Sequence, residues 1–209
     1  MPDKRIAVVC SARSSHTKNE GTTTRLLRAA NIAGNMHGSG AREEILSIVQ
    51  DIKDDHLQAA GISIQSSQLR EKYGEMVKAE CQSLVEVLES VQHMEEVSLK
   101  AENKIISKGE KLACQYLAIL LEDRGVPAHY IDLSDVVERH NISTTTLENH
   151  MYKALTDAFR HDILACDVKV PVITGYFGDL AAGLLHSVGR GYSFPESVPP
   201  FYSDILTCC

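Results

Sequence analysis

Short apolar runs alternate with amphipathic stretches along this chain, and the alternation predicts an α/β fold. Residues 5–10 (Arg-Ile-Ala-Val-Val-Cys), 128–133 (Ala-His-Tyr-Ile-Asp-Leu) and 168–174 (Val-Lys-Val-Pro-Val-Ile-Thr) are typical of short buried strands. Helical spacing of apolar residues predicts helices over 147–164 and over a stretch that opens within 105–112 and ends at Asp123, before Arg-Gly-Val-Pro. Strands that alternate with helices favour parallel pairing through right-handed crossovers.

A long helical insert is predicted between the first strand and the helix that ends at Asp123. Apolar residues recur at helical spacing over 43–60 and 68–94, including the stripe Leu84, Val87, Leu88 and Val91. We expect this stripe to face the core, with a partner-binding surface as the alternative interpretation. Connections are expected at 38–40 and 61–67, where Gly and Ser gather.

A glycine-rich loop near the end of the chain has the composition of an anion-binding loop. Gly189 and Gly191 let the backbone turn its N–H groups toward an anion, and Arg190 between them offers a planar fork for a carboxylate or phosphate. In α/β sheets such loops follow the carboxyl ends of strands. A surface turn that carries a solvated Arg explains the same three residues.

Hydroxyl and carboxyl groups near two expected helix starts have a structural explanation. Thr residues at 22–24 follow a hydroxyl-rich loop and have the position of N-caps. Ser107 and Glu110 have the spacing of a capping box at the start of the helix that ends at Asp123.

Six short motifs in order resemble the aspartate kinases, in particular those of fungal type. They lie at 8–14 (Val-Val-Cys-Ser-Ala-Arg-Ser), 21–27 (Gly-Thr-Thr-Thr-Arg-Leu-Leu), 107–110 (Ser-Lys-Gly-Glu), 123–128 (Asp-Arg-Gly-Val-Pro-Ala), 171–178 (Pro-Val-Ile-Thr-Gly-Tyr-Phe-Gly) and 189–193 (Gly-Arg-Gly-Tyr-Ser). The resemblance implies an amino-acid-kinase-like three-layer sandwich with a mainly parallel sheet, here incomplete and carrying the helical insert. It also implies phosphoryl transfer from MgATP to the β-carboxylate of L-aspartate in lysine, threonine and methionine biosynthesis, with ATP and Mg²⁺ as cofactors.

The same resemblance implies which residues bind the substrate. Glu110 is expected to accept the ammonium group of L-aspartate, and Arg190 to bind its α-carboxylate. Tyr176 matches an aromatic residue that packs against the substrate. The hydroxyl residues that match the family's aspartate pocket are Ser11, Thr24 and Ser193. Because the substrate supplies its own nucleophile, a site of this kind positions two anions and needs no catalytic Ser or Cys.

Several parts of the family pattern are not found in the sequence. The phosphate-binding motif Lys-Phe-Gly-Gly-Thr-Ser has no match, Phe194 stands where the family has Asp, and neither the ATP-binding lobe nor regulatory domains are recognised. We therefore expect a partial aspartate-binding domain at 1–193, an irregular divergent tail at 194–209 and impaired catalysis. Two alternatives stay open: a non-catalytic relative that binds aspartate or a kinase subunit, and a truncated gene product without its own function.

Composition and charge indicate which kinds of partner and which cellular compartment to expect. Lys and Arg are scattered along 209 residues of net charge −7, which disfavours nucleic-acid binding. No apolar run approaches the ~20 residues of a membrane span, and the first residues do not resemble a secretory signal. The six Cys and nine His lack metal-ligand spacing, so we expect no metal site and reduced thiols in a cytoplasmic protein. An incomplete sheet would expose apolar edges, which predicts a homo-oligomer or pairing with a full-length kinase subunit.

Overall fold

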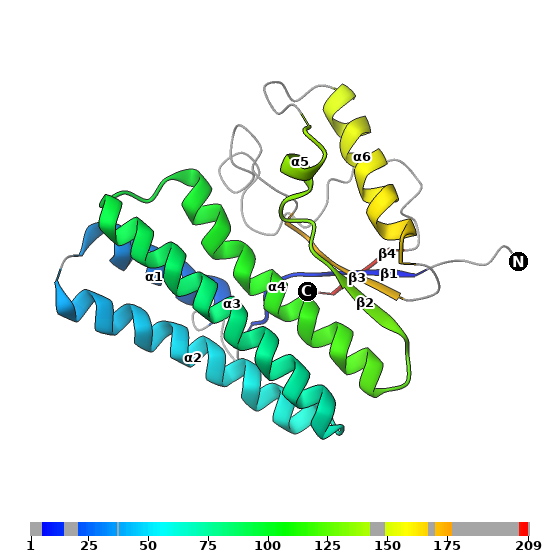
Figure 1. Ribbon diagram of the computed structural model, residues 1–209, viewed down its shortest axis with the longest axis horizontal. Coiled ribbons are helices and arrows are strands. Elements are labelled where there is room, and N and C mark those ends of the chain that lie inside the picture. Colours follow the sequence, from blue (N-terminus) through cyan, green and yellow to red (C-terminus); the bar gives the residue numbers. More distant parts are fainter. Residues whose placement is uncertain are drawn as a thin grey trace, which may run out of the picture.

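Four long helices pack beside a small parallel sheet in the structure, which is a computed structural model (Figure 1). The structure describes residues 6–14, 21–36, 38–142, 149–166, 170–176 and 205–208. The helices are α1 (Thr22–Asn35), α2 (Ser39–Ser63), α3 (Ser67–Met94), α4 (Leu99–Asp123), α5 (Val136–Arg139) and α6 (Asn149–Leu164). The strands are β1 (Ala7–Cys10), β2 (Ala128–Ile131), β3 (Val170–Thr174) and β4 (Ile205–Cys208).

All strand pairs in the sheet are parallel, in the order β2-β3-β1-β4. Val172 of β3 pairs with Val8 of β1 on one side and with Tyr130 of β2 on the other. The carboxyl ends of β1, β2 and β3 therefore meet at one edge of the sheet. The predicted parallel pairing and the three strand locations are confirmed.

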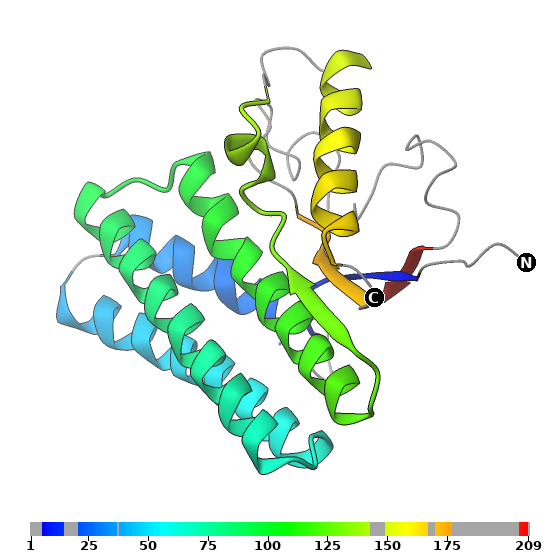
Figure 2. The same ribbon diagram turned by 45° about the vertical axis from the view of Figure 1, so that its right-hand side comes forward.

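Successive side chains of each strand point to opposite faces of the sheet, as the two-residue repeat of a strand requires. Val8, Cys10 and Val172 pack against Cys114 and its neighbours on α4. Val9 and Ile173 pack instead with the buried residues of α5 and α6. The sheet thus lies between the helical bundle and the α5–α6 layer (Figure 2), which confirms the three-layer α/β prediction.

The helical insert forms the largest core of the described chain. Leu84, Leu88 and Val91 are completely or almost completely buried there, so the stripe on α3 faces the core as expected. Tyr73 lies among them, donates a hydrogen bond from its hydroxyl to the Leu112 carbonyl and contacts His56. These contacts join α2, α3 and α4 into one bundle.

Both expected caps are wrong. Helix α4 begins about two and a half turns earlier than expected, at Leu99, where the Ser98 hydroxyl accepts a hydrogen bond from the Ala101 N–H. Ser107 and Glu110 therefore lie inside the helix, where no N-terminal N–H groups need a cap. Helix α1 begins at Thr22 with Gly21 as its N-cap and no side-chain cap.

The last described strand differs from the irregular segment expected over 194–209. Ile205–Cys208 forms β4, which pairs with β1 along its whole length. The run Ile-Leu-Thr-Cys is only four residues long and follows three prolines, so its local pattern is weak. Pairing with β1, nearly 200 residues away in the sequence, supplies the backbone partners that define it.

Gly109 marks a close approach between α4, α1 and the loop that follows β1. A Cβ atom at this position would lie 2.9 Å from the Ala12 Cβ and 3.2 Å from Leu26 Cδ1. We expect Gly109→Ala to lower the free energy of unfolding by about 1–3 kcal/mol, because the packed backbones would have to separate. Gly61→Ala, at an open position of α2, is expected to raise it by up to about 1 kcal/mol. Urea unfolding of both variants checks this, and equal effects would contradict it.

Candidate active site

Glu110 lies at the edge of the sheet where β1 and β3 end. Its carboxylate accepts a hydrogen bond of 2.6 Å from the Tyr176 N–H, and the Gly175 N–H also donates to it. Gly175 and Tyr176 directly follow β3. In α/β proteins this edge is where ligands bind.

Burial makes the Glu110 carboxyl unusual. Loss of solvent raises its pKa to about 7, and the hydrogen bonds from Tyr176 and Gly175 only partly oppose that shift. A carboxyl with this pKa changes charge near neutral pH. A cation bound beside it would stabilise the ionised form and lower this pKa.

The position of Glu110 is fixed by contacts of Cys114, which lies one helical turn later in α4. The thiol of Cys114, four residues later and completely buried, donates to the Ile173 carbonyl at 3.2 Å. Cys114 also lies against the end of β1, because its sulfur is 3.9 Å from the Cys10 carbonyl. Glu110 and Cys114 share one face of the helix, so this packing directs Glu110 toward the same edge.

The structure brings together part of the predicted aspartate pocket. Glu110 and Tyr176 are in direct contact through the hydrogen bond described above. Ser11 directly follows β1 and is half-buried, and Ala12 beside it lies against Gly109. Thr24 lies in the first turn of α1. The other predicted positions, Gly189, Arg190, Gly191 and Ser193, lie outside the described residues.

Lys108, within the same four-residue motif as Glu110, has a structural contact that the sequence did not indicate. Its ammonium pairs with Glu80 at 2.7 Å and donates to the Ser83 hydroxyl at 2.9 Å. Gln115 also donates to Glu80. These contacts tie α3 to α4 and place Lys108 on a different face from Glu110.

A second ion pair links α4 to the sheet beside Glu110. Lys111 contacts Asp132, which directly follows β2, at 2.8 Å. The pairing with Lys111 and a hydrogen bond from Ser134 hold the pKa of Asp132 below its usual value, against the opposing effect of burial. The pair fixes the carboxyl end of β2 relative to the helix that carries Glu110.

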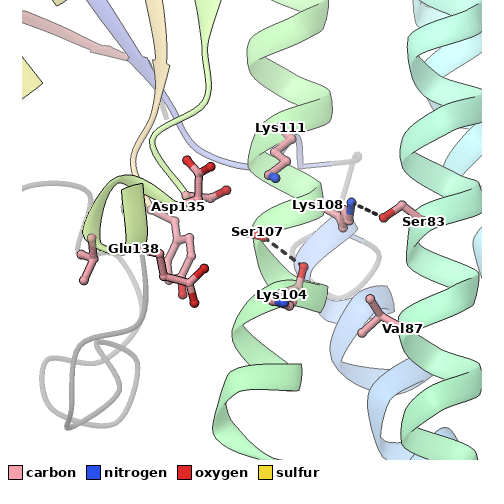
Figure 3. Close-up of a pocket in the computed structure, with 11 residues that line it drawn as sticks. Ser83, Val87, Lys104, Ser107, Lys108, Lys111, Asp135 and Glu138 are labelled. Atoms are coloured by element: carbon pink, nitrogen blue, oxygen red, sulfur yellow. Dashed lines mark hydrogen bonds between the residues drawn. The ribbon is translucent and has the colours of Figure 1, made fainter. Parts of the chain in front are cut away.

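A polar cavity of about 280 Å³ lies next to this region (Figure 3). One side of the cavity is formed by α4, which contributes Lys104, Lys108 and Lys111. The facing side contains Asp135 and Glu138, at the start of α5 and within it. Further lining residues include Ser83, Ser107 and Tyr176. The charges of this cavity are mixed, since Lys108 and Lys111 each already contact a carboxylate.

Comparison with known proteins finds similarity to fungal aspartokinases. The chain is 36% identical to the aspartokinase of Schizosaccharomyces pombe over 195 residues, and 37% identical to that of Candida albicans over 196 residues. These matches cover 91% and 90% of the chain. The chain is a homologue of the aspartokinases. No family model matches it, and it spans 36% and 35% of the length of these two relatives.

The fold of this aspartokinase homologue agrees with the sequence comparison. Escherichia coli aspartokinase III, solved in complex with aspartate and ADP, superposes with a TM-score of 0.63 at 19% identity. The similarity covers 90% of this chain and 38% of the bacterial one. None of the helices in the described part of the chain has the length and apolar character needed to cross a membrane.

Proposed function

We propose that this aspartokinase homologue binds L-aspartate at Glu110 and takes part in the ATP-dependent phosphorylation of its β-carboxylate, a step toward lysine, threonine and methionine. The buried Glu110 carboxylate carries the proposal. It lies at the ligand-binding edge of a parallel sheet and is oriented by a backbone N–H. The fungal aspartokinases and the aspartate-bound bacterial structure support the choice of substrate.

Two of the three charged groups of L-aspartate have a protein partner in this proposal. The substrate ammonium binds Glu110, and the α-carboxylate binds Arg190 within the loop of Gly189 and Gly191. The β-carboxylate stays free to attack the terminal phosphorus of ATP, with ADP as the leaving group. Such a reaction depends on positioning and charge neutralisation, so no protein nucleophile is required.

The smaller groups of the pocket complete the proposed site. Ser11, Thr24 and Ser193 offer hydroxyls to the bound amino acid, and Tyr176 packs its ring against it. Among the described residues, no group of carboxylate, imidazole or thiol ligands gathers beside Glu110. In this proposal Mg²⁺ enters as part of MgATP, held by the nucleotide phosphates and by water.

Affinity for L-aspartate is expected to rise with pH through about 7. Below pH 7 the Glu110 carboxyl is mostly protonated in the free protein, and binding the substrate ammonium requires it to ionise. The dissociation constant should therefore fall by up to about tenfold per pH unit below 7 and level off above pH 8. Isothermal titration calorimetry between pH 5.5 and 8.5 measures this.

L-malate provides the matched ligand control, because it has a hydroxyl in place of the ammonium. Its affinity should not rise with pH, since a neutral hydroxyl does not favour ionised Glu110. No binding of L-aspartate at pH 8, or equal pH profiles for the two ligands, would overturn the assignment of Glu110. Trapping aspartyl phosphate with hydroxylamine in the presence of MgATP separates a kinase from a relative that only binds the amino acid.

A further inference from the structure

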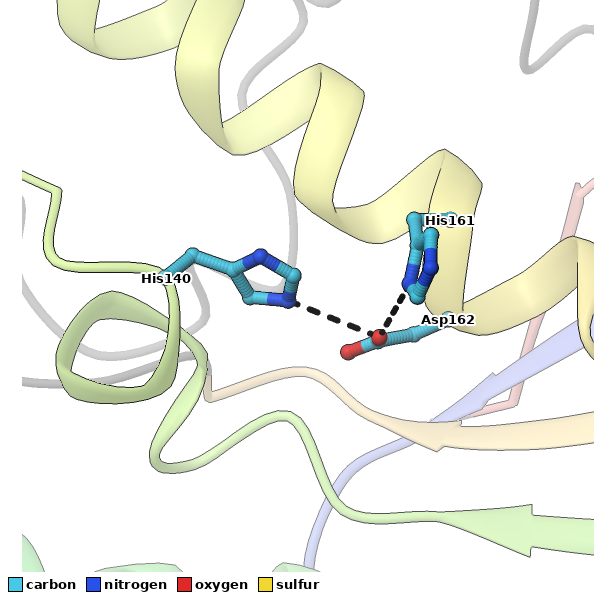
Figure 4. Close-up of side chains that lie close together, drawn as sticks. All are labelled: His140, His161 and Asp162. Atoms are coloured by element: carbon cyan, nitrogen blue, oxygen red, sulfur yellow. Dashed lines mark hydrogen bonds and ion pairs between the residues drawn. The ribbon is translucent and has the colours of Figure 1, made fainter.

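Two histidines and an aspartate converge between α5 and α6 (Figure 4). These elements pack on the opposite face of the sheet from α4. His140 lies directly after α5, and His161 and Asp162 lie in the last turn of α6. One carboxylate oxygen of Asp162 lies 3.3 Å from His161 Nδ1 and 3.5 Å from His140 Nε2. We propose that His140, His161 and Asp162 bind a Zn²⁺ ion that joins α5 to α6.

The separations of these atoms suit a tetrahedral ion. Ligand atoms about 2.0–2.1 Å from Zn²⁺ lie about 3.3–3.4 Å from one another. Two of the three separations, 3.3 and 3.5 Å, are close to this value, and the third pair, His140 with His161, lies within 4.8 Å. This third separation would have to shorten when the ion binds, and the exposed His161 side chain has the freedom to move. A water molecule would complete the four ligands, as in other sites with three protein ligands.

Arg139 orients the carboxylate of this site. Its guanidinium contacts the second oxygen of Asp162 at 3.0 Å, which leaves the first oxygen facing both imidazoles. Arg139 is itself held by Asp135 at 2.7 Å and by the Asp132 carbonyl at 3.0 Å. Fixed partners of this kind behind a ligand are typical of metal sites. The Asp162 side chain is only 10% exposed, so its position is determined by packing.

The ligand types favour Zn²⁺ over the Mg²⁺ that accompanies ATP. Imidazole nitrogens bind Zn²⁺ well, whereas Mg²⁺ prefers oxygen ligands and keeps most of its water. The proposed role is to join two elements of the fold, with three protein ligands and one position left for water. The elements α5 and α6 share a hydrophobic core, formed by Leu133, Val136 and Val137 on one side and Leu155 and Phe159 on the other. The ion would hold α5 and α6 together at the border of this core.

Zn²⁺ titration of the EDTA-treated, fully reduced chain at pH 7.5 tests the proposal. We expect one ion per chain, with at least about tenfold weaker binding in His161→Ala and in His140→Ala. His161 is 77% exposed, so its removal should leave the far-UV circular dichroism unchanged. His93→Ala, at an exposed position on α3, is the matched control and should bind as the wild type does.

A second measurement separates this site from the chain's thiols. Co²⁺ bound by imidazole and carboxylate gives visible bands without the near-ultraviolet absorption of a cobalt–thiolate bond. Zn²⁺ should also raise the melting temperature of the wild type and of His93→Ala, but not that of His161→Ala. Absence of Zn²⁺ binding in the wild type, a thiolate spectrum, or unchanged affinity in both histidine variants would each overturn the proposal. In that case the three side chains form ion pairs only.

Discussion

Glu110→Gln is expected to weaken L-aspartate binding at least about 100-fold at pH 8 and, at the same time, to stabilise the fold. Loss of binding follows because a neutral amide cannot neutralise the substrate ammonium in a buried site, where truncating one partner of a charge pair costs about 2–5 kcal/mol. Gln keeps the size of the side chain, and its carbonyl oxygen can still accept the hydrogen bond from the Tyr176 N–H.

The gain in stability follows from the raised pKa. Folding shifts the Glu110 carboxyl from its ordinary 4.5 to about 7, so the folded state binds a proton that the unfolded state releases between these pH values. Stability therefore falls as pH rises from 4.5 to 7, and the full penalty of up to about 3 kcal/mol is present at pH 8. Glu110→Gln removes this penalty, and its advantage should shrink to below about 1 kcal/mol at pH 5.

Urea unfolding at pH 5 and pH 8, together with calorimetry of L-aspartate, measures both effects. Glu43→Gln is the matched control, because Glu43 is an exposed carboxylate on α2. It should change neither binding nor the pH dependence of stability. A variant that lost binding but was less stable than the wild type at both pH values would show that Glu110 is mainly structural. Unchanged binding would contradict its role as the ammonium acceptor.

Lys108→Met is expected to lower the free energy of unfolding by about 3–5 kcal/mol. Lys108 and Glu80 are 10% and 19% exposed, so removing the ammonium leaves the Glu80 carboxylate mostly buried, with the hydrogen bond from Gln115 but without its ion pair. Removing one partner of a buried ion pair lowers stability by about this much, because the other charge stays buried without a partner. Replacing both partners by apolar residues recovers much of the lost stability. The double variant Glu80→Leu with Lys108→Met should therefore be more stable than Lys108→Met alone.

Thermal and urea unfolding of the single and double variants form a complete cycle with the wild type. Lys72→Met is the matched control, because its pair with Glu122 is about half exposed, and it should change stability by less than about 1 kcal/mol. Equal effects of Lys72→Met and Lys108→Met would show that burial does not strengthen the α3–α4 contact. Since Lys108 lies on a different face from Glu110, L-aspartate binding by the folded fraction should persist in Lys108→Met.

Local patterns determined the location and type of most elements. Short apolar runs indicated β1, β2 and β3, and amphipathic spacing indicated α2, α3 and α6, because burial imposes a characteristic periodicity on each kind of element. Alternation of these elements was enough to predict parallel pairing. The six motifs indicated the family, which the comparisons with fungal aspartokinases confirm.

Other features depend on contacts between distant residues. Glu110 has the spacing of a capping residue, and its place inside α4 follows from a helix start at Ser98. Ser98 before a run of good helix formers was a usable signal for that start. By contrast, nothing local pairs Lys108 with Glu80 or Lys111 with Asp132, since the packing of α4 against α3 and the sheet creates both ion pairs.

The sequence by itself therefore determined the element types, the parallel sheet and Glu110 as the residue of interest. Only the tertiary structure decided that Glu110 is buried against the end of β3, which gives it a pKa near 7. It also decided that His140 meets His161 and Asp162, more than twenty residues away. Periodicity reports which face of an element is buried, whereas charge and ligand geometry depend on which side chains the packed elements bring within a few ångströms.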